Sequence, residues 1–367
     1  MIFKKLPLFT ATCIDKDNFG FPLVFDFELF YDPELDMFRQ KSNDKLNDLL
    51  FDIYKKGSLA DGSISSESGK VYVNKVTGYL LANFDFKENS KVLEIGFGLG
   101  TILFELNKLT SSKLFGIEPG DYEVKYDLNN IELVNDFFPS TKLIQKFNLI
   151  YSLLVLEHVE DPLKFLENIQ LNLEKEGTII LAVPNCEQYL LEGDISIFIH
   201  EHFSYFTRES IVKLVSKTEL EIDDISIIEG ALIFTLSNNK KLKMLPLSFK
   251  KILYDDFTNR VDQFTSNFLE LTKFYEQNDI AIYSPIRAMN FLYLAKMLDV
   301  RLVDDNIELK GRFLPSLNST IESFEQICLK PPKLIVIYSR TFAEKIKLKC
   351  KESDVLRETN ILCLDQI

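Results

Sequence analysis

The chain has 367 residues, of which 42 are Lys or Arg and 55 are Asp or Glu, so its formal charge at pH 7 is −13. This length predicts two or three domains. The chain is acidic and its basic residues occur at most in pairs, so it lacks the positive face that binding to nucleic acid requires. Its longest apolar runs, 149–156 and 178–183, are far shorter than the roughly 18 residues of a membrane span. Neither nucleic acid nor a membrane is an expected partner.

The cysteines and the opening sequence indicate a cytoplasmic protein. The start, MIFKKLPLFTATC, has a basic beginning and an apolar run, but Pro7 interrupts that run and makes it a poor signal peptide. Five scattered cysteines without a C-x-x-C pair fit reduced thiols. With only three histidines in the chain, no structural zinc site is expected.

The order of predicted elements indicates an α/β fold. Residues 1–65 form an N-terminal segment with a helix over 33–54 and a polar loop beginning at residue 57. Strands at 91–95, 113–117, 131–134, 147–151 and 178–183 then alternate with helices through residue 81, at 101–108, after Asp121 and at 162–175. This alternation predicts a doubly wound, Rossmann-like parallel sheet in a domain spanning 66–240.

The pattern changes after residue 206. A helix over 208–217 precedes two strands, 221–228 and 231–236, whose Glu229-Gly230 turn predicts an antiparallel pair. An amphipathic helix over 248–277 is expected to bridge two domains within 241–278. Strands at 280–283, 301–304 and 334–337 with helices at 288–298 and 341–349 predict a second, smaller Rossmann-like α/β domain over 279–367.

A glycine turn follows the first strand of the larger domain, as Gly96-Phe97-Gly98-Leu99-Gly100. Glycines between a strand and a helix let the backbone approach a ligand at the helix N-terminus. A dinucleotide fingerprint would need a glycine where Thr101 stands. G-x-G-x-G preceded by an acid, here Glu94, is instead the pattern of S-adenosylmethionine sites.

Two strand-end acids extend this pattern. Glu118 lies 20 residues past Gly98, where a carboxylate accepts hydrogen bonds from ribose hydroxyls. Asp136 follows a third strand and is expected to reach the adenine amino group, with Asn135 as the alternative. Phe137 packs either on the adenine or in the core. Together these residues disfavour a turn that serves chain reversal alone.

Four segments in this order resemble the class I methyltransferases: EIGFGLG at 94–100, FGIEP at 115–119, FNLIYSLLVLEHVEDP at 147–162 and GTIILAVPN at 177–185. In that family the equivalent of 152–156 is the floor beneath the cofactor. The resemblance implies an S-adenosyl-L-methionine site made of Glu94, Gly96, Phe97, Gly98, Gly100, Glu118, Pro119, Asp136, Phe137, Ser152 and Leu153. His158, just after the floor, is predicted to be mainly structural.

The segment HEHFSYF at 200–206 follows the last parallel strand and therefore lies near the carboxyl edge of the sheet, where ligands bind. If it is extended, His200 and His202 point to one side and Glu201 to the other. A metal held by the two histidines lacks an evident third ligand, and a solvated loop is the plainer alternative. A neutral imidazole here is suited to moving a proton near pH 7, for a carbon, oxygen or nitrogen acceptor.

This segment, with IYSPIRAMNFLYL at 282–294, VDDNIELKGRFLP at 303–315 and KLIVIYSRTFAEKI at 333–346, resembles the bacterial sugar C-methyltransferases of deoxysugar pathways. The resemblance implies a nucleotide-linked keto-sugar as substrate and His202 as general base, assisted by Glu201 and Tyr205. Candidate substrate contacts are His200, Arg287 and Asp305.

The chain departs from that family at two places. Ile199 replaces a tyrosine, and only Cys13 stands where the family carries an N-terminal zinc module. An O- or N-methyltransferase of a sugar or acidic sugar is therefore the alternative, and a non-catalytic scaffold is disfavoured by the intact glycines and acids.

Overall fold

The computed structural model describes residues 5–8, 21–55, 67–120, 126–238, 254–314, 316–340 and 342–367. The chain divides into two compact units, one of residues 30–187 and 201–251 and the other of residues 1–29, 188–200 and 252–367. Most of the predicted loop at 57–69, the start of the helix after Asp121, and Cys13 lie outside the described residues.

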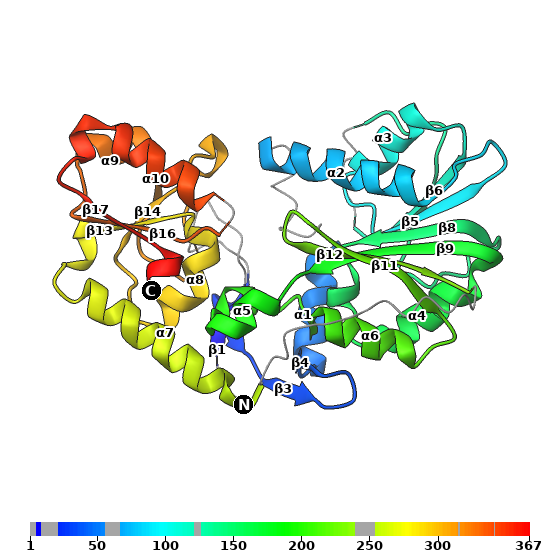
Figure 1. Ribbon diagram of the computed structural model, residues 1–367, viewed down its shortest axis with the longest axis horizontal. Coiled ribbons are helices and arrows are strands. Elements are labelled where there is room, and N and C mark those ends of the chain that lie inside the picture. Colours follow the sequence, from blue (N-terminus) through cyan, green and yellow to red (C-terminus); the bar gives the residue numbers. More distant parts are fainter. Residues whose placement is uncertain are drawn as a thin grey trace. The chain divides into compact units, whose positions relative to one another are not determined.

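A seven-stranded sheet forms the centre of the first unit, in the order β11-β12-β9-β8-β5-β6-β7 (Figure 1). Its strands are β5 (Lys91–Ile95), β6 (Lys113–Glu118), β7 (Glu132–Asn135), β8 (Phe147–Leu153), β9 (Leu173–Pro184), β11 (Glu221–Ile228) and β12 (Ala231–Ser237). The strands from β5 to β9 are parallel, while β12 pairs antiparallel with both β9 and β11. The predicted Rossmann-like sheet with a terminal antiparallel pair is confirmed.

Helices cover both faces of this sheet and make two separate cores. On one face α2 (Glu67–Asn83) and α3 (Thr101–Leu109) contribute Val76, Leu80 and Leu103. On the other, α4 (Pro162–Leu171) and α6 (Arg208–Ser216) contribute Leu166 and Leu214. Because both faces are covered, the parallel strands read as nearly continuous apolar runs, which is why the sequence predicts them well.

The predicted helix over 33–54 is wrong in its first half. A hairpin of β3 (Leu29–Asp32) and β4 (Met37–Gln40) precedes α1 (Asp44–Lys55). The Asp32 carboxylate accepts hydrogen bonds from the backbone N–H groups of Glu34 and Leu35, and Asp36 has a φ of 51°. These interactions favour a turn over a helix. The helix begins only after Asn43, whose side chain accepts a hydrogen bond from Leu46 N.

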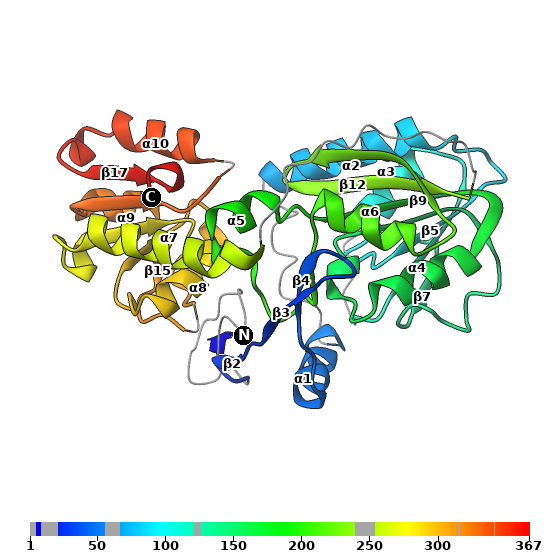
Figure 2. The same cartoon turned by 60° about the horizontal axis from the view of Figure 1, so that its bottom comes forward.

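The other unit is built on a five-stranded parallel sheet in the order β15-β14-β13-β16-β17. Its two edge strands, β15 and β17, are labelled in Figure 2. Its strands are β13 (Ile280–Tyr283), β14 (Arg301–Val303), β15 (Ile321–Glu322), β16 (Leu334–Ile337) and β17 (Asn360–Cys363). The helices α8 (Pro285–Leu294), α9 (Phe324–Leu329) and α10 (Ala343–Glu352) connect them. The first strand and β16 have the predicted bounds, whereas β15, α9 and β17 were not predicted.

Two further differences concern the ends of elements. Of the long helix expected over 248–277, residues 248–253 lie outside the described residues, and α7 (Phe257–Thr272) follows a 3-10 turn at Tyr254–Asp256 in the same unit. A short antiparallel pair, β1 (Lys5–Pro7) with β2 (Val24–Asp26), and the end of α5 (Glu187–Glu192) also belong to this unit. The predicted helix over 162–175 ends four residues early, since β9 already begins at Leu173.

No helix among the described residues combines the length and apolar character needed to cross a lipid bilayer.

Candidate active site

The glycine turn between β5 and α3 has a backbone conformation that favours glycine, and at Gly96 it leaves no room for a side chain. Gly96, Gly98 and Gly100 all have positive φ values, of 78°, 50° and 77°. A Cβ atom built on Gly96 would lie 2.4 Å from Cγ2 of Val155. The turn therefore requires glycine at Gly96 for conformation and for space, and it leaves the start of α3 open to a ligand.

The two acids flanking this turn have different environments. Glu94 is buried, accepts a hydrogen bond from Tyr151 Oη at 2.9 Å, and has a pKa raised to about 8 by burial. Glu118 ends β6, and its carboxylate accepts hydrogen bonds from Gly98 N at 3.2 Å and Gly120 N at 2.8 Å. Burial also raises the pKa of Glu118. Glu94 thus supports the turn from beneath, whereas Glu118 ties the turn to the end of the neighbouring strand.

Asn135 and Asp136, at the end of β7, are the two candidates for binding the adenine amino group, and their hydrogen bonds differ. The Asn135 side chain donates hydrogen bonds to the carbonyl oxygens of Glu118 and Gly120, so it is engaged with the backbone. Asp136 accepts hydrogen bonds from Ser140 Oγ and Phe137 N, and these interactions lower its pKa. Asp136 is half-buried and also pairs with Lys142 Nζ at 3.3 Å. An ionised carboxylate of this kind is the better acceptor for an exocyclic amine.

The remaining predicted cofactor residues line the same edge of the sheet. Ser152 donates a hydrogen bond to Ile95 O at 2.9 Å, and Leu153 is packed at the end of β8. Phe97 packs against Gly116 of β6, where an added Cβ would lie 2.7 Å from its ring. Pro119 follows directly after Glu118 and is half-buried. The structure therefore brings the strand ends of β5, β6, β7 and β8 to one edge.

The segment 200–206 is not extended at its beginning. His200 and Glu201 form a turn, so the expected alternation of side chains is wrong. The chain then passes into β10 (Ser204–Tyr205), which pairs antiparallel with β4. Phe203 N donates to Glu157 O at 2.7 Å, and Gln40 N donates to Phe203 O at 3.0 Å. These bonds fix His202 between the end of β8 and the hairpin.

Two buried carboxyls and two half-buried imidazoles form a polar cluster, and we name Glu157, His158, Glu201 and His202 the histidine cluster. The rings of His158 and His202 meet edge to face with centroids 4.7 Å apart. His158 Nε2 lies 3.9 Å from Glu157 Oε1, and His158 Nδ1 lies 4.0 Å from Glu201 Oε2. The structure thus brings His158, expected to be structural, against the predicted base.

Burial determines the protonation of this cluster. Burial lowers the pKa of His158 to about 4 and lowers that of His202 well below its usual range, with a smaller contribution from His158. Burial also raises the pKa of the Glu157 carboxyl to about 8. Both imidazoles are therefore neutral near pH 7 and have lone pairs that can accept a proton.

Metal-ligating side chains do come together here, but the group contains His202 without His200 and so differs from the histidine pair that the sequence suggested. Ligand atoms of Glu157, His158 and His202 all lie within 4.8 Å of one another, which is close enough to hold a cation after small rotations. Glu157 Oε2 is buried and has no hydrogen-bond partner among the described residues. Tyr205 completes the surroundings of His202, with ring centroids 6.3 Å apart.

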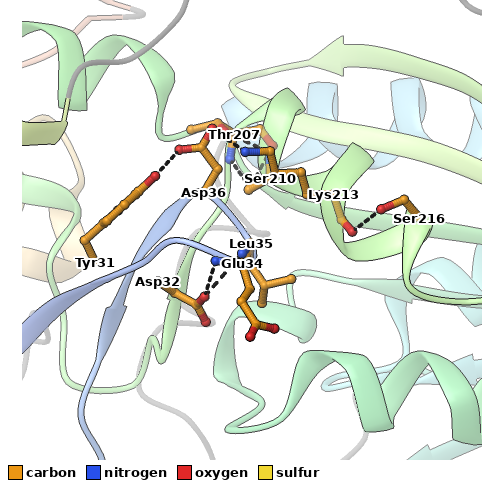
Figure 3. A network of polar contacts seen from close by, with 9 residues as sticks. All are labelled: Tyr31, Asp32, Glu34, Leu35, Asp36, Thr207, Ser210, Lys213 and Ser216. Carbon is orange, nitrogen blue, oxygen red and sulfur yellow. Dashed lines mark hydrogen bonds and ion pairs between the residues drawn. The ribbon is translucent and has the colours of Figure 1, made fainter.

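A polar network anchors the elements that carry the cluster (Figure 3). Asp36 of the β3–β4 turn accepts hydrogen bonds from Tyr31 Oη at 2.6 Å and from Lys213 Nζ of α6 at 2.9 Å. The first turn of α6 is closed by a reciprocal capping box between Thr207 and Ser210. The hairpin and α6 therefore fix both ends of the segment that contains β10.

The three predicted substrate contacts lie in the other unit. His200 is fully buried, with its ring edge to face against Phe27 at 5.1 Å between centroids. Burial lowers its pKa to about 4. Arg287 is exposed in the first turn of α8, and Asp305 pairs with Lys349 Nζ at 2.6 Å and accepts from Tyr283 Oη. His200 is thus a packing residue, while Arg287 and Asp305 stand at strand ends of the five-stranded sheet.

Sequence reasoning also missed Tyr72 of α2. Its hydroxyl is buried without a hydrogen-bond partner among the described residues, and its pKa is raised by burial and then by Glu157 and Glu94. A neutral phenol between these two carboxyls can donate a hydrogen bond to a ligand. No signal in the sequence separated it from the core positions of the same helix.

Comparisons with known proteins agree with this geometry. A family described as a methyltransferase domain matches residues 72–225. A tRNA U34 carboxymethyltransferase of Campylobacter hominis is 28% identical over 140 residues, which cover 34% of this chain and 45% of that protein. One from Campylobacter jejuni is 31% identical over 123 residues, covering 31% and 40%. The chain thus spans less than half the length of the curated relatives it matches.

Structure comparison aligns part of this chain with solved methyltransferases of several kinds. An S-adenosylmethionine-dependent methyltransferase from Clostridium acetobutylicum is 12% identical, with a TM-score of 0.38, and covers 52% of this chain and 98% of its own. Magnesium protoporphyrin IX methyltransferase from Synechocystis is 13% identical, with a TM-score of 0.38, and covers 54% and 99%.

The larger unit therefore contains a methyltransferase domain of the S-adenosylmethionine-dependent class. The enzyme class and cofactor predicted from the sequence are confirmed at the level of this domain. These comparisons do not show the resemblance to sugar C-methyltransferases, because the curated relatives are named as tRNA U34 carboxymethyltransferases.

Proposed function

We propose that this protein is a cytoplasmic, S-adenosylmethionine-dependent methyltransferase whose acceptor is a nucleotide-linked keto-sugar, with His202 as the general base. The observation that carries the proposal is the juxtaposition of His202 and His158 beside Glu157, directly after the strand that ends at the cofactor edge. Glu201 and Tyr205 assist His202 by surrounding it with hydrogen-bonding groups.

The residues at the sheet edge fit this cofactor. The open glycine turn suits an amino-acid tail, the Glu118 carboxylate suits two ribose hydroxyls, and Asp136 suits the adenine amine. When bound, S-adenosylmethionine supplies an electrophilic methyl group on a sulfonium sulfur.

The chain's own residues supply the proton transfer. Neutral His202 removes a proton from the carbon beside the ketone, and the electron pair stays on the acceptor. The positive charge that His202 gains favours release of the Glu157 proton to solvent, and the carboxyls of Glu157 and Glu201 both lie next to its partner ring, His158. An oxygen or nitrogen acceptor could use the same base, and this is the alternative reaction.

Two features support a nucleotide-linked sugar over nucleic acid. In the five-stranded sheet the strand order reverses between β13 and β16, which is where open α/β sheets bind nucleotides. Arg287 follows β13 and Asp305 follows β14, so an anion-binding and a hydroxyl-binding group stand near that edge. The net charge of −13 opposes binding of tRNA, the molecule in the relatives' names.

The test is mass spectrometry of a nucleotide-sugar pool that includes 4-keto sugars, incubated with the protein and S-adenosylmethionine in heavy water. We expect a methylated keto-sugar, together with deuterium washed into the unmethylated keto-sugar beside its carbonyl by reversible proton removal, and we expect both to be lost in His202→Gln. Product mass also separates a methyl group from a carboxymethyl group.

Matched arms make the result decisive. Retained thermal stabilisation of His202→Gln by S-adenosylhomocysteine would show that the variant is folded and still binds cofactor product. Methylation of a non-keto sugar without deuterium would show that the acceptor atom is an oxygen or a nitrogen and not a carbon. Modification of bulk tRNA, with no product from any sugar, would refute the proposed acceptor.

A further inference from the structure

We propose that α1 of the N-terminal segment is part of the cofactor site, and that Phe51 and Phe137 together hold the adenine ring. This inference rests on the proposed function only in that the ligand carries adenine. It assigns a binding role to a helix that precedes the methyltransferase domain in the chain.

The first observation is an aromatic pair at the adenine end of the sheet edge. The rings of Phe51 and Phe137 are stacked, with centroids 5.4 Å apart and planes inclined by 15°. The two side chains remain 44% and 40% exposed, which is unusual for stacked phenylalanines. Phe137 directly follows Asp136, the candidate acceptor for the adenine amine.

The second observation is that α1 is held firmly by its other face. Leu46, Leu50 and Ile53, at helical spacing, are each at most 2% exposed. At the start of the helix, Ser42 and Asn47 donate hydrogen bonds to the carboxylate of Glu160, just beyond the histidine cluster. These contacts fix the helix and leave Phe51 outside its buried face.

Arg39 strengthens this anchor from the preceding strand. Its guanidinium donates a hydrogen bond to the carbonyl oxygen of Glu160. The β4–α1 connection is thus tied at two points to the loop that follows β8. Phe51 is therefore presented beside Phe137 by a restrained helix, so little ordering is required when a ligand binds.

The chemistry of the exposed pair selects its ligand. Flat purines stack on aromatic side chains, and the Asp136 carboxylate beside the pair accepts hydrogen bonds but donates none. Adenine offers a donating amine at this edge, whereas hypoxanthine offers a carbonyl oxygen there. The pair and the acid together therefore favour an adenosine group.

The chain contains no tryptophan, which permits a direct test. In Phe51→Trp the single indole should change its fluorescence on titration with S-adenosylhomocysteine, while Phe274→Trp, at an 81% exposed position of the other unit, should not. By calorimetry, Phe51→Ala should weaken S-adenosylhomocysteine on the order of tenfold, and methylthioadenosine by the same factor. Phe274→Ala should leave both affinities unchanged.

The outcomes separate this inference from the proposed function. Equal affinity of the unmodified protein and Phe51→Ala for S-adenosylhomocysteine, with no indole response, would overturn the role of α1 and leave the methyltransferase intact. Failure of the unmodified protein to bind either adenosine compound would overturn the proposed function instead. Phe51→Leu, which keeps an apolar side chain without a ring, should fold like the parent and reproduce the weaker binding.

Discussion

Replacing Gly96 by alanine should destabilise the methyltransferase domain by both strain and collision. The residue has a φ of 78°, which costs an alanine roughly 1–2 kcal/mol. Its Cβ would also lie 2.4 Å from Cγ2 of Val155, and valine is stiff at χ1. Overpacking of this kind costs about 1–3 kcal/mol. The two contributions together amount to roughly 2–5 kcal/mol.

Gly230→Ala is the matched control, because Gly230 has a φ of 83° in the β11–β12 turn but nothing lies within 4 Å of an added Cβ. Thermal unfolding should show a clearly lower Tm for Gly96→Ala than for Gly230→Ala, by about 2–4 °C per kcal/mol of difference. Adding Val155→Ala should recover part of the loss at Gly96, beyond its own effect. Equal Tm shifts in the two glycine variants would refute the close approach as a cause.

Three further predictions concern charge and metal. The pKa of Glu94 in the folded protein is raised to about 8, so its contribution to stability is present below pH 4 and is lost as pH rises toward 8. In urea unfolding, Glu94→Gln should therefore flatten the fall in the free energy of unfolding over this pH range. An unchanged pH dependence of that free energy would contradict the raised pKa. Dialysis against a chelator should leave methyl transfer unchanged, because the histidine cluster acts as base; lost activity restored by a divalent cation would mean that it holds metal instead. In the other unit, Asp194→Ala should cost about 1–3 kcal/mol by denaturant unfolding, because it removes the acceptor of the buried Tyr338 hydroxyl and one of the two acids that pair with half-buried Arg340. Asp279→Ala, which breaks a surface pair with Lys333, should cost under about 1 kcal/mol, and similar costs would refute the difference in burial.

The sheet could be predicted from the sequence because its signals are local. Apolar runs, the glycine turn and the Glu229-Gly230 hairpin each depend on residues that are neighbours in the chain. The hairpin before α1 could not be predicted in this way, because its strands are short. Its turn depends on hydrogen bonds from backbone N–H groups to the Asp32 side chain, and these compete with a helical pattern in the sequence.

The candidate site was predicted less completely, for a physical reason. Its cofactor half is a set of strand ends whose positions follow from the sheet, so the glycines, Glu118 and Asp136 could be chosen in advance. The histidine cluster depends instead on a contact between residues 157–158 and residues 201–202, which are far apart in the chain and are held together by the Phe203–Glu157 backbone bond, β10 and the hairpin. Phe51 likewise reaches Phe137 across a long separation.

The protonation of the histidine cluster bears on the reaction that the site can perform. At pH 7 the raised pKa of Glu157 and the lowered pKa values of the two imidazoles leave all three groups mainly uncharged. Two neutral imidazoles beside a neutral carboxyl favour a neutral part of a substrate, such as a carbonyl group. Transfer of a proton to His202 then creates a positive charge, which is balanced only when the buried Glu157 carboxyl releases its own proton to solvent and becomes a carboxylate. The same burial that weakens His202 as a base in isolation therefore makes its action dependent on the carboxyl beside it.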